Sequence, residues 1–108
     1  MIEAADSLLD AFARSDVEAL DRLCADDVLV WGTDAGEEWS GKAELLAAFE
    51  GAFDLQVAWT RELRSAGGWV AGEAEFTLAD GTHMSARVTM LFGDGLLVHA
   101  HYSTPAEP

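Results

Sequence analysis

Three dipeptides typical of tight turns, Gly67-Gly68, Asp80-Gly81 and Asp94-Gly95, divide the second half of the chain into segments of similar length. Such dipeptides are strong short-range signals for β-hairpins, because their residues adopt the backbone angles that these turns require. The sequence therefore predicts an antiparallel meander of four strands. The expected strands are Leu55–Ser65, Trp69–Ala79, Thr82–Phe92 and Leu96–Thr104.

The first half of the chain carries apolar residues at helical spacing. One amphipathic helix is expected from Ile2 to Ala13. A second is expected to start at Ser15, which forms a capping-box pattern with Glu18. A third is expected after Ser40, a good helix cap, with its apolar stripe ending at Phe53.

A short buried strand, Val28 to Trp31, and a loop, Gly32 to Gly41, are expected between the second and third helices. At 108 residues, half of them hydrophobic, the chain has the size of one compact domain, so residues 1–108 are expected to fold as a single unit. The predicted class is α+β. Its three N-terminal helices pack in the concave face of a curved antiparallel four-stranded meander with a short first strand.

The register of the strands decides which side chains face the helices. A three-residue loop around Asp80-Gly81 sets Phe76 opposite Met84, which matches apolar to apolar. The same loop around Asp94-Gly95 pairs Met90 with Val98 and Ala86 with Tyr102. A two-residue turn at Gly67-Gly68 brings Trp59 opposite Phe76 and Arg61 opposite Ala74.

The inner face is then apolar except for Arg61 and the Tyr102 hydroxyl, and it predicts a ligand pocket. Arg61 either anchors an acidic ligand or pairs with a helix carboxylate, and Tyr102 either donates a hydrogen bond or fills space. The candidate pocket residues are Trp31, Trp39, Trp59, Arg61, Phe76, Met84, Val88 and Tyr102.

The opposite face of the predicted sheet is polar. Its candidate residues are Glu73, Arg87, Thr89, His99 and His101. In solvent their ion pairs contribute little, but a second subunit covering this face would make them specify the docking register. The interpretation favoured here is a homodimer interface, with the histidines packed inside it. A metal site needs at least a third ligand, so no metal is expected.

Charge and cysteine content exclude several classes of protein. The formal net charge is −14, which argues against binding to nucleic acid or to an anionic membrane surface. Cys24, the single cysteine, excludes an internal disulfide and is expected to be a buried, inert thiol. No apolar run has the length of a membrane span, and a cytoplasmic location is expected.

Specific strings join this pattern: SDVEALDRLCADDV, GTDAGEEWSGKAEL, RVT and VHAHYSTP. Together they resemble the SnoaL-like branch of the nuclear transport factor 2-like superfamily, and also the association domain of calcium/calmodulin-dependent protein kinases. The resemblance spans nearly the whole chain and implies a cone-shaped α+β barrel. The acids used by ketosteroid isomerases of this fold correspond to Gly32 and Val88, so that mechanism does not transfer. Asp34 lies nearest to the usual catalytic position, as a general base or as a loop-stabilising side chain.

Two functions from different classes follow from these observations. The first is binding of a small apolar molecule inside the cone, with or without a cofactor-independent isomerisation, cyclisation or dehydration in which Asp34 and Tyr102 are the candidate catalytic residues. The second is a non-catalytic homo-oligomerisation domain whose interior is filled. The presence of an internal cavity would favour the first.

Overall fold

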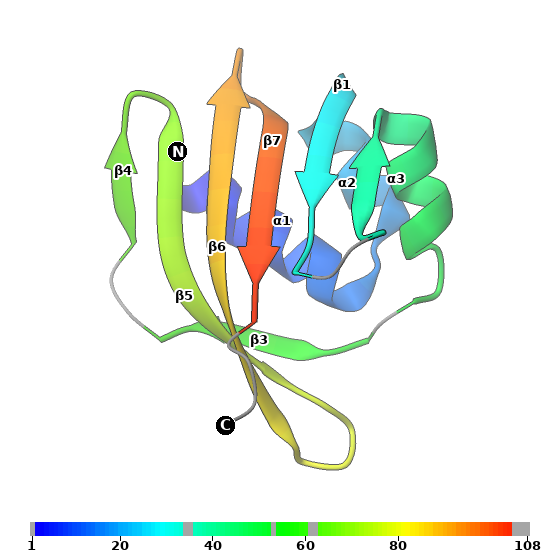
Figure 1. Cartoon of the computed structure of the whole chain (residues 1–108), viewed down its shortest axis with the longest axis vertical. Helices are drawn as coiled ribbons and strands as arrows, with labels where there is room; N and C mark the ends of the chain where they lie inside the picture. Colours follow the sequence, from blue (N-terminus) through cyan, green and yellow to red (C-terminus); the bar gives the residue numbers. More distant parts are fainter. Residues whose placement is uncertain (1, 34–35, 53, 61–62, 105–108) are drawn as a thin grey trace.

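The computed structural model describes residues 2–33, 36–52, 54–60 and 63–104. These residues form three helices and seven strands. The elements are α1 (Ile2–Arg14), α2 (Val17–Leu23), β1 (Cys24–Trp31), β2 (Glu38–Ser40), α3 (Lys42–Phe49), β3 (Gln56–Trp59), β4 (Arg64–Ala66), β5 (Trp69–Thr77), β6 (His83–Gly93) and β7 (Leu96–Ser103). Figure 1 shows one curved sheet with the helices gathered on one side of it.

The sheet is mixed rather than a purely antiparallel meander. Its strand order is β2-β1-β7-β6-β5-β3, and β4 pairs with β5 beyond the end of β3. Strand β1 runs parallel to β7, which brings β1 and its partner β2 into the sheet. The antiparallel order β3-β5-β6-β7 follows the expected meander, but β1 and β2 extend it, and among the described residues the sheet is open, with β2 and β3 as its edges, rather than a barrel.

The junction between α1 and α2 differs from the capping box expected at Ser15. Ser15 has a φ of 52°, and its amide donates to Phe12 while the amide of Asp16 donates to Ala11. This left-handed turn ends α1 and satisfies its last carbonyl groups. Asp16 caps α2 instead, because its carboxylate accepts a hydrogen bond from the Ala19 amide at 3.2 Å.

Strand β2 was not expected, because the segment Gly32 to Gly41 has the composition of a loop. Trp39 pairs with Val30 in an antiparallel ladder, and Ser40 pairs with Leu29. Ser40 therefore belongs to a strand and does not cap α3. Gly41 occupies that cap position without a side-chain hydrogen bond. Phe53, expected at the end of the third apolar stripe, lies outside the described residues.

The predicted register of β5 against β6 is confirmed, with Phe76 opposite Met84. The predicted register of β6 against β7 is wrong by two residues, since Met90 pairs with Ala100. Gly93 pairs with Leu96, so the turn has two residues rather than three, and an irregularity between Leu91 and Phe92 adds a second residue to the shift by leaving Val98 without a ladder partner. Ala100 and Tyr102 keep the inner face that alternation predicted, but on the other side of the irregularity Leu97 lies opposite Phe92 and is fully buried in place of Val98.

The single strand expected from Leu55 to Ser65 is divided into β3 and β4. Ala66 pairs with Trp69, as the two-residue turn at Gly67-Gly68 predicts, but Trp59 pairs with Ala74 rather than Phe76. The bare backbone of Gly72 makes room there for the side chains of Trp59 and Leu63. Trp59 thus occupies the place opposite Ala74 that had been assigned to Arg61.

The core lies between the helices and the inner face of the sheet. Its largest fully buried side chains include Leu8 from α1, Leu20 from α2, Leu45 from α3 and Leu97 from β7. Burial of these side chains, which come from all three helices and from the sheet, supplies the main stabilisation of the fold. None of the helices in the described part of the chain is long and apolar enough to cross a membrane.

Candidate functional site

A cavity of about 290 Å³ lies between the inner face of the sheet and helices α1 and α3. Its lining is predominantly apolar and comes from segments far apart in the sequence. Side chains that form its walls include Leu9, Phe12, Phe49, Val88, Met90 and Ala100. Most of these are buried, whereas Thr33, Met84 and His101 are exposed lining residues and mark the mouth.

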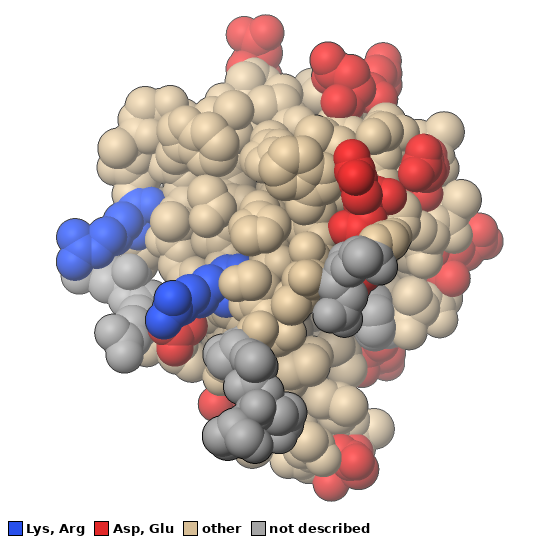
Figure 2. Space-filling model, viewed as in Figure 1, with Lys and Arg blue, Asp and Glu red and all other residues tan. Residues whose placement is uncertain are grey.

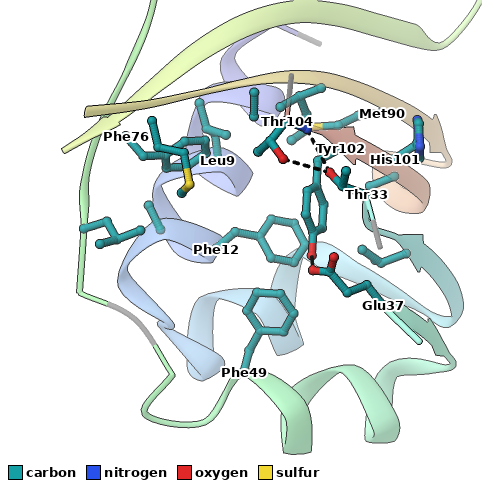
Figure 3. Close-up of a pocket in the computed structure, with 17 residues that line it drawn as sticks. Leu9, Phe12, Thr33, Glu37, Phe49, Phe76, Met90, His101, Tyr102 and Thr104 are labelled. Carbon is teal, nitrogen blue, oxygen red and sulfur yellow. Dashed lines mark hydrogen bonds between the residues drawn. The ribbon is translucent and has the colours of Figure 1, made fainter. Parts of the chain in front are cut away.

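One wall of the cavity carries a pair of polar side chains. The Tyr102 hydroxyl donates a hydrogen bond of 2.7 Å to Oε2 of Glu37. Both residues line the cavity, and Figure 3 shows the Tyr102 ring between Phe12 and the loop that carries Glu37. A half-buried carboxylate that accepts a phenolic hydroxyl is a defined polar anchor in apolar surroundings.

Gly32 makes this hydrogen bond possible. A Cβ atom at Gly32 would lie 2.5 Å from the Tyr102 hydroxyl oxygen and 2.7 Å from Cβ of Glu37. The amide of Gly32 also donates to the carbonyl of Glu37 at 2.6 Å, which closes the loop between β1 and β2. A side chain at position 32 is therefore incompatible with the observed placement of Tyr102.

A second contact joins the end of β7 to the same loop. The hydroxyl oxygen of Thr33 accepts hydrogen bonds from the Thr104 amide, at 2.8 Å, and from the Thr104 hydroxyl, at 3.3 Å. Both threonines line the cavity. The two bonds hold the loop against the strand that carries Tyr102, and so they fix the relative position of Glu37 and the phenol.

Aromatic rings form the wall next to this pair. The rings of Phe12 and Phe49 meet edge to face with their centres 5.2 Å apart, and Trp39 packs on Phe49 at the same distance. Phe12 and Phe49 line the cavity, whereas Trp39 contacts Phe49 and is not itself a lining residue. Edge-to-face packing holds such rings in fixed orientations.

The residues expected to line a pocket are distributed over three places. Phe76, Met84, Val88 and Tyr102 line the cavity. The two expected tryptophans Trp39 and Trp59 are half-buried beside it, and the indole nitrogen of Trp59 donates to Asp6 at 3.2 Å. Trp31 lies on the opposite face of the sheet. Arg61 and Asp34 lie outside the described residues.

Sequence reasoning missed Glu37, which is the carboxylate of the site. The signal was the acidic pair Glu37-Glu38 next to Trp39, which alternates as a strand does. Glu38 is exposed and Glu37 half-buried, as expected for neighbours on opposite sides of an extended segment. The turn formers around this short segment masked that alternation. Leu9, Phe12 and Phe49 lie at the apolar positions of the expected helices, and they form part of the cavity wall.

The outer face of the sheet carries the other predicted group. Glu73 pairs with Arg87 as expected, but Thr89 pairs with His101 and Leu91 with His99. The shift of β7 thus moves both histidines by one pair along the face. His101 is exposed and also contributes to the mouth of the cavity.

Two tryptophans join His99 on this outer face. The ring centres of Trp31 and Trp69 lie 5.2 and 6.0 Å from that of His99, both edge to face. Trp31 is 42% exposed and Trp69 is 43% exposed. Figure 2 shows an uncharged area in the upper middle of this face, with basic side chains to its lower left and acidic side chains to its right.

Metal and cysteine chemistry find little support in the described part of the chain. No group of three or more histidine, cysteine, aspartate or glutamate side chains is placed there to hold a metal ion. Cys24 is buried, as expected. Desolvation raises the pKa of its thiol to about 11, against the opposing charge of Lys42, so the thiol is protonated at neutral pH.

Solved structures with the same fold include proteins of several kinds. A proposed ketosteroid isomerase from Kribbella flavida matches with a TM-score of 0.82 and 24% identity, over 98% of this chain and 78% of that chain. An LEH-like epoxide hydrolase of M. tuberculosis matches with a TM-score of 0.78 and 14% identity, over 96% and 81%. A hypothetical protein with a ketosteroid isomerase-like fold from Catenulispora acidiphila, in complex with trimethylamine, matches with a TM-score of 0.77 and 15% identity, over 93% and 83%.

At these identities the likeness shows a shared fold. No protein of curated function matches the sequence significantly. The family model for the SnoaL-like domain matches residues 5–99, which is most of the chain. The chain therefore belongs to the SnoaL-like domain family.

Proposed function

We propose that this protein binds a small, largely apolar molecule in the cavity between the sheet and helices α1 and α3. The cavity itself carries the proposal, because its volume of about 290 Å³ lies between largely apolar walls that carry the hydrogen-bonded pair Tyr102 and Glu37. Ligand sites in proteins commonly combine an apolar lining with a few placed polar groups. The volume is at the low end of the usual range, roughly 300–1,000 Å³, which favours a small ligand.

The polar pair also supplies the chemistry for a reaction that needs no cofactor. Among the described lining residues, Glu37 and His101 are the side chains of a type that titrates below neutral pH or near it, and Figure 3 shows His101 on the far side of Tyr102 from the Phe12 and Phe49 rings. Glu37 is thus the group placed to exchange a proton with a bound molecule. An isomerisation, cyclisation or dehydration is the reaction class that fits.

A thermal-shift screen with a matched pair of variants tests the binding proposal. Ala86 is buried and lines the cavity, whereas Ala71 is exposed on β5. Small apolar alcohols, ketones and amines are screened against the wild type, Ala86→Leu and Ala71→Leu. A ligand at about a hundred times its dissociation constant adds roughly 2.7 kcal/mol to the free energy of unfolding.

The proposal expects stabilisation of the wild type and of Ala71→Leu, with loss of the effect in Ala86→Leu, because the added side chain fills the cavity. Tyr102→Phe gives a second test that leaves the volume nearly unchanged and removes the hydroxyl. Equal stabilisation of all these variants would place the ligand elsewhere and contradict the proposal.

A second candidate function is self-association through the outer face of the sheet. The observation that favours it is the exposed cluster of Trp31 and Trp69 around His99. Large exposed aromatic side chains of this kind are enriched where proteins meet. The occupant proposed is a second copy of this chain. This function is compatible with a ligand in the cavity, because the two surfaces lie on opposite faces of the sheet.

A further inference from the structure

The charge of the cavity constrains the ligand more narrowly than its shape does. The lining contains the carboxylate of Glu37, and none of the described residues that line the cavity is a lysine or an arginine. The Tyr102 hydroxyl donates to Oε2 of Glu37, which orients the carboxylate at the cavity wall. A carboxylate in apolar surroundings gains most from a partner of opposite charge.

The rings around this carboxylate favour the same partner. Phe12, Phe49 and Tyr102 all line the cavity, and Figure 3 shows their rings gathered on the side where Glu37 lies. The face of an aromatic ring attracts a cation, and groups of such rings bind alkylammonium ions. The centres of Phe12 and Phe49 are 5.2 Å apart, so a small ligand can contact both rings at once.

Other ligand charges fit less well. An anion would meet the Glu37 carboxylate and the formal net charge of −14 of the whole chain. A neutral ligand could form a hydrogen bond with the carboxylate but would not add the attraction between opposite charges. His101, also among the described lining residues, lies at the mouth rather than beside the rings.

From this arrangement we infer that the ligand is a small alkyl- or cycloalkylammonium ion, with its charged nitrogen at Glu37 and its hydrocarbon part against Phe12, Phe49 and the inner face of the sheet. This inference rests on the proposed function, since it names the chemical class of the molecule that the cavity binds. The nitrogen would donate a hydrogen bond to the carboxylate, and its neighbouring carbon atoms would lie against the aromatic rings.

Calorimetric titration at neutral pH with three compounds tests the inference. The compounds share the same cyclohexyl ring and differ in charge. Cyclohexylamine is a cation there, cyclohexanol is neutral and cyclohexanecarboxylate is an anion. The proteins are the wild type, Glu37→Gln and the matched control Glu38→Gln. The control removes the same charge from the neighbouring residue, whose side chain is exposed and is not part of the lining.

The expected order of affinity for the wild type is cyclohexylamine, then cyclohexanol, then cyclohexanecarboxylate. Glu37→Gln should weaken the binding of cyclohexylamine by roughly tenfold or more and leave that of cyclohexanol nearly unchanged. Glu38→Gln should bind all three as the wild type does. The order measured on the wild type stands as a test even if Glu37→Gln folds poorly.

Each contrary outcome has a distinct meaning. If cyclohexanol or the carboxylate binds the wild type as tightly as cyclohexylamine, the ammonium inference is overturned and the binding function stands. The same conclusion follows if Glu37→Gln and Glu38→Gln weaken cyclohexylamine equally, because the effect is then one of overall charge. If none of the three compounds binds, the proposed function itself is contradicted.

Discussion

Tyr102 at the end of β7 donates a hydrogen bond of 2.7 Å to Glu37, which lies 65 positions earlier in the loop before β2. The bond joins the last strand of the sheet to the loop that follows the first strand. It exists because β1 and β7 run side by side in parallel, with Val30 opposite Ala100. The candidate site is therefore a product of the parallel pairing, which a simple meander would not create.

Replacement of Gly32 by alanine should destabilise the protein and disturb this pair. The added Cβ would lie 2.5 Å from the Tyr102 hydroxyl oxygen, so the phenol must move. Overpacking of this kind typically costs about 1–3 kcal/mol. Urea unfolding of Gly32→Ala measures the loss of stability. The control is Gly93→Ala, whose new Cβ would meet nothing nearer than Val98 at 3.4 Å. Equal stability of the two variants would contradict the geometry given for position 32.

Substitutions on the buried face of helix α1 should lower the free energy of unfolding much more than substitutions on its exposed face. Leu8 is fully buried and Ile2 is 46% exposed on the same helix. Leu8→Ala is expected to cost about 2–5 kcal/mol, because it leaves a cavity in the core. Ile2→Ala should cost less than about 1 kcal/mol, as surface substitutions do. Comparison of the two midpoints in urea checks this. A larger loss for Ile2→Ala would reverse the assignment of the faces.

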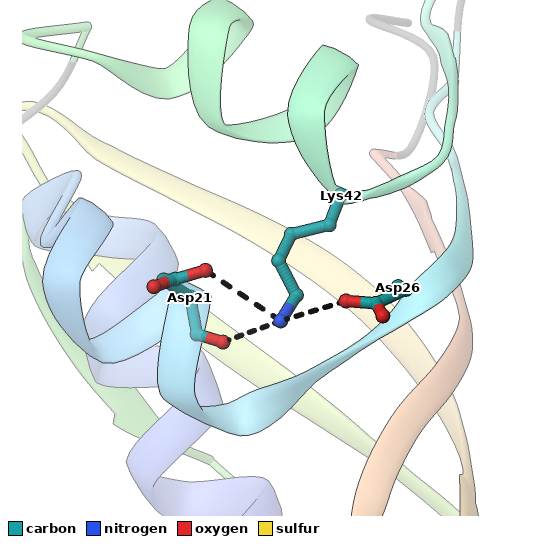
Figure 4. A network of polar contacts seen from close by, with 3 residues as sticks. All are labelled: Asp21, Asp26 and Lys42. Atoms are coloured by element: carbon teal, nitrogen blue, oxygen red, sulfur yellow. Dashed lines mark hydrogen bonds and ion pairs between the residues drawn. The ribbon is translucent and has the colours of Figure 1, made fainter.

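Lys42 should stabilise the fold in a manner that depends on pH. Its Nζ lies 3.5 Å from Asp21 and 3.4 Å from Asp26, and it donates to the carbonyl of Asp21 at 2.8 Å, which ties α3 to α2 and β1 (Figure 4). Desolvation opposes the charge, but the hydrogen bond to Asp26 and the charges of Asp21 and Asp26 outweigh it and raise the pKa of Lys42 above 10.5. A raised pKa means that the contribution is complete at lower pH and is lost as pH rises through the folded value.

Thermal unfolding of the wild type and Lys42→Met tests this expectation. The variant should melt at a lower temperature than the wild type at neutral pH. The difference should narrow when both are measured well above pH 10.5. Other alkaline effects act on both proteins and cancel in the comparison. A difference that stays constant across this range would show that the ammonium charge is not the source of the stabilisation.

If two copies of the chain associate through the outer face of the sheet, reversal of a charge on that face should weaken their association. Arg87 lies on β6 opposite Glu73 of β5, and Arg87→Glu sets two acids side by side. Sedimentation velocity should then show a higher monomer fraction for this variant at a given concentration. Arg22→Glu is the control, because Arg22 is exposed on α2, away from the sheet. If Arg87→Glu sediments as the wild type does, the interface lies elsewhere.

The strongest predictions from sequence rested on patterns that are local. Alternation along β6 and the turn at Asp80-Gly81 were enough to pair Phe76 with Met84 correctly. The turn at Gly67-Gly68 likewise set Ala66 against Trp69. In each case the residues that decide the register lie close together along the chain, and side-chain parity allows few alternatives.

The predictions that were wrong or incomplete concern contacts between residues distant in sequence. The parallel pairing of β1 with β7 leaves no local signal, and without it Glu37 cannot be placed beside Tyr102. Strand β2 is stabilised by pairing with β1 rather than by the propensity of its own residues. Trp31 was assigned to the interior, but Val30 takes that position and the alternation of the strand directs Trp31 to the outer face.

Methionine-methyl NMR tests the central claim most directly. Met84 and Met90 both line the cavity, and the indole of Trp69 on the outer face serves as the internal control. Cyclohexylamine and, separately, cyclohexanol are titrated into protein labelled with ¹³C at the methionine methyl groups. Binding in the cavity predicts saturable shifts of the Met84 and Met90 signals, with the Trp69 indole signal unchanged. Unchanged methionine signals up to the solubility limit of both compounds would contradict the claim that this cavity is a binding site.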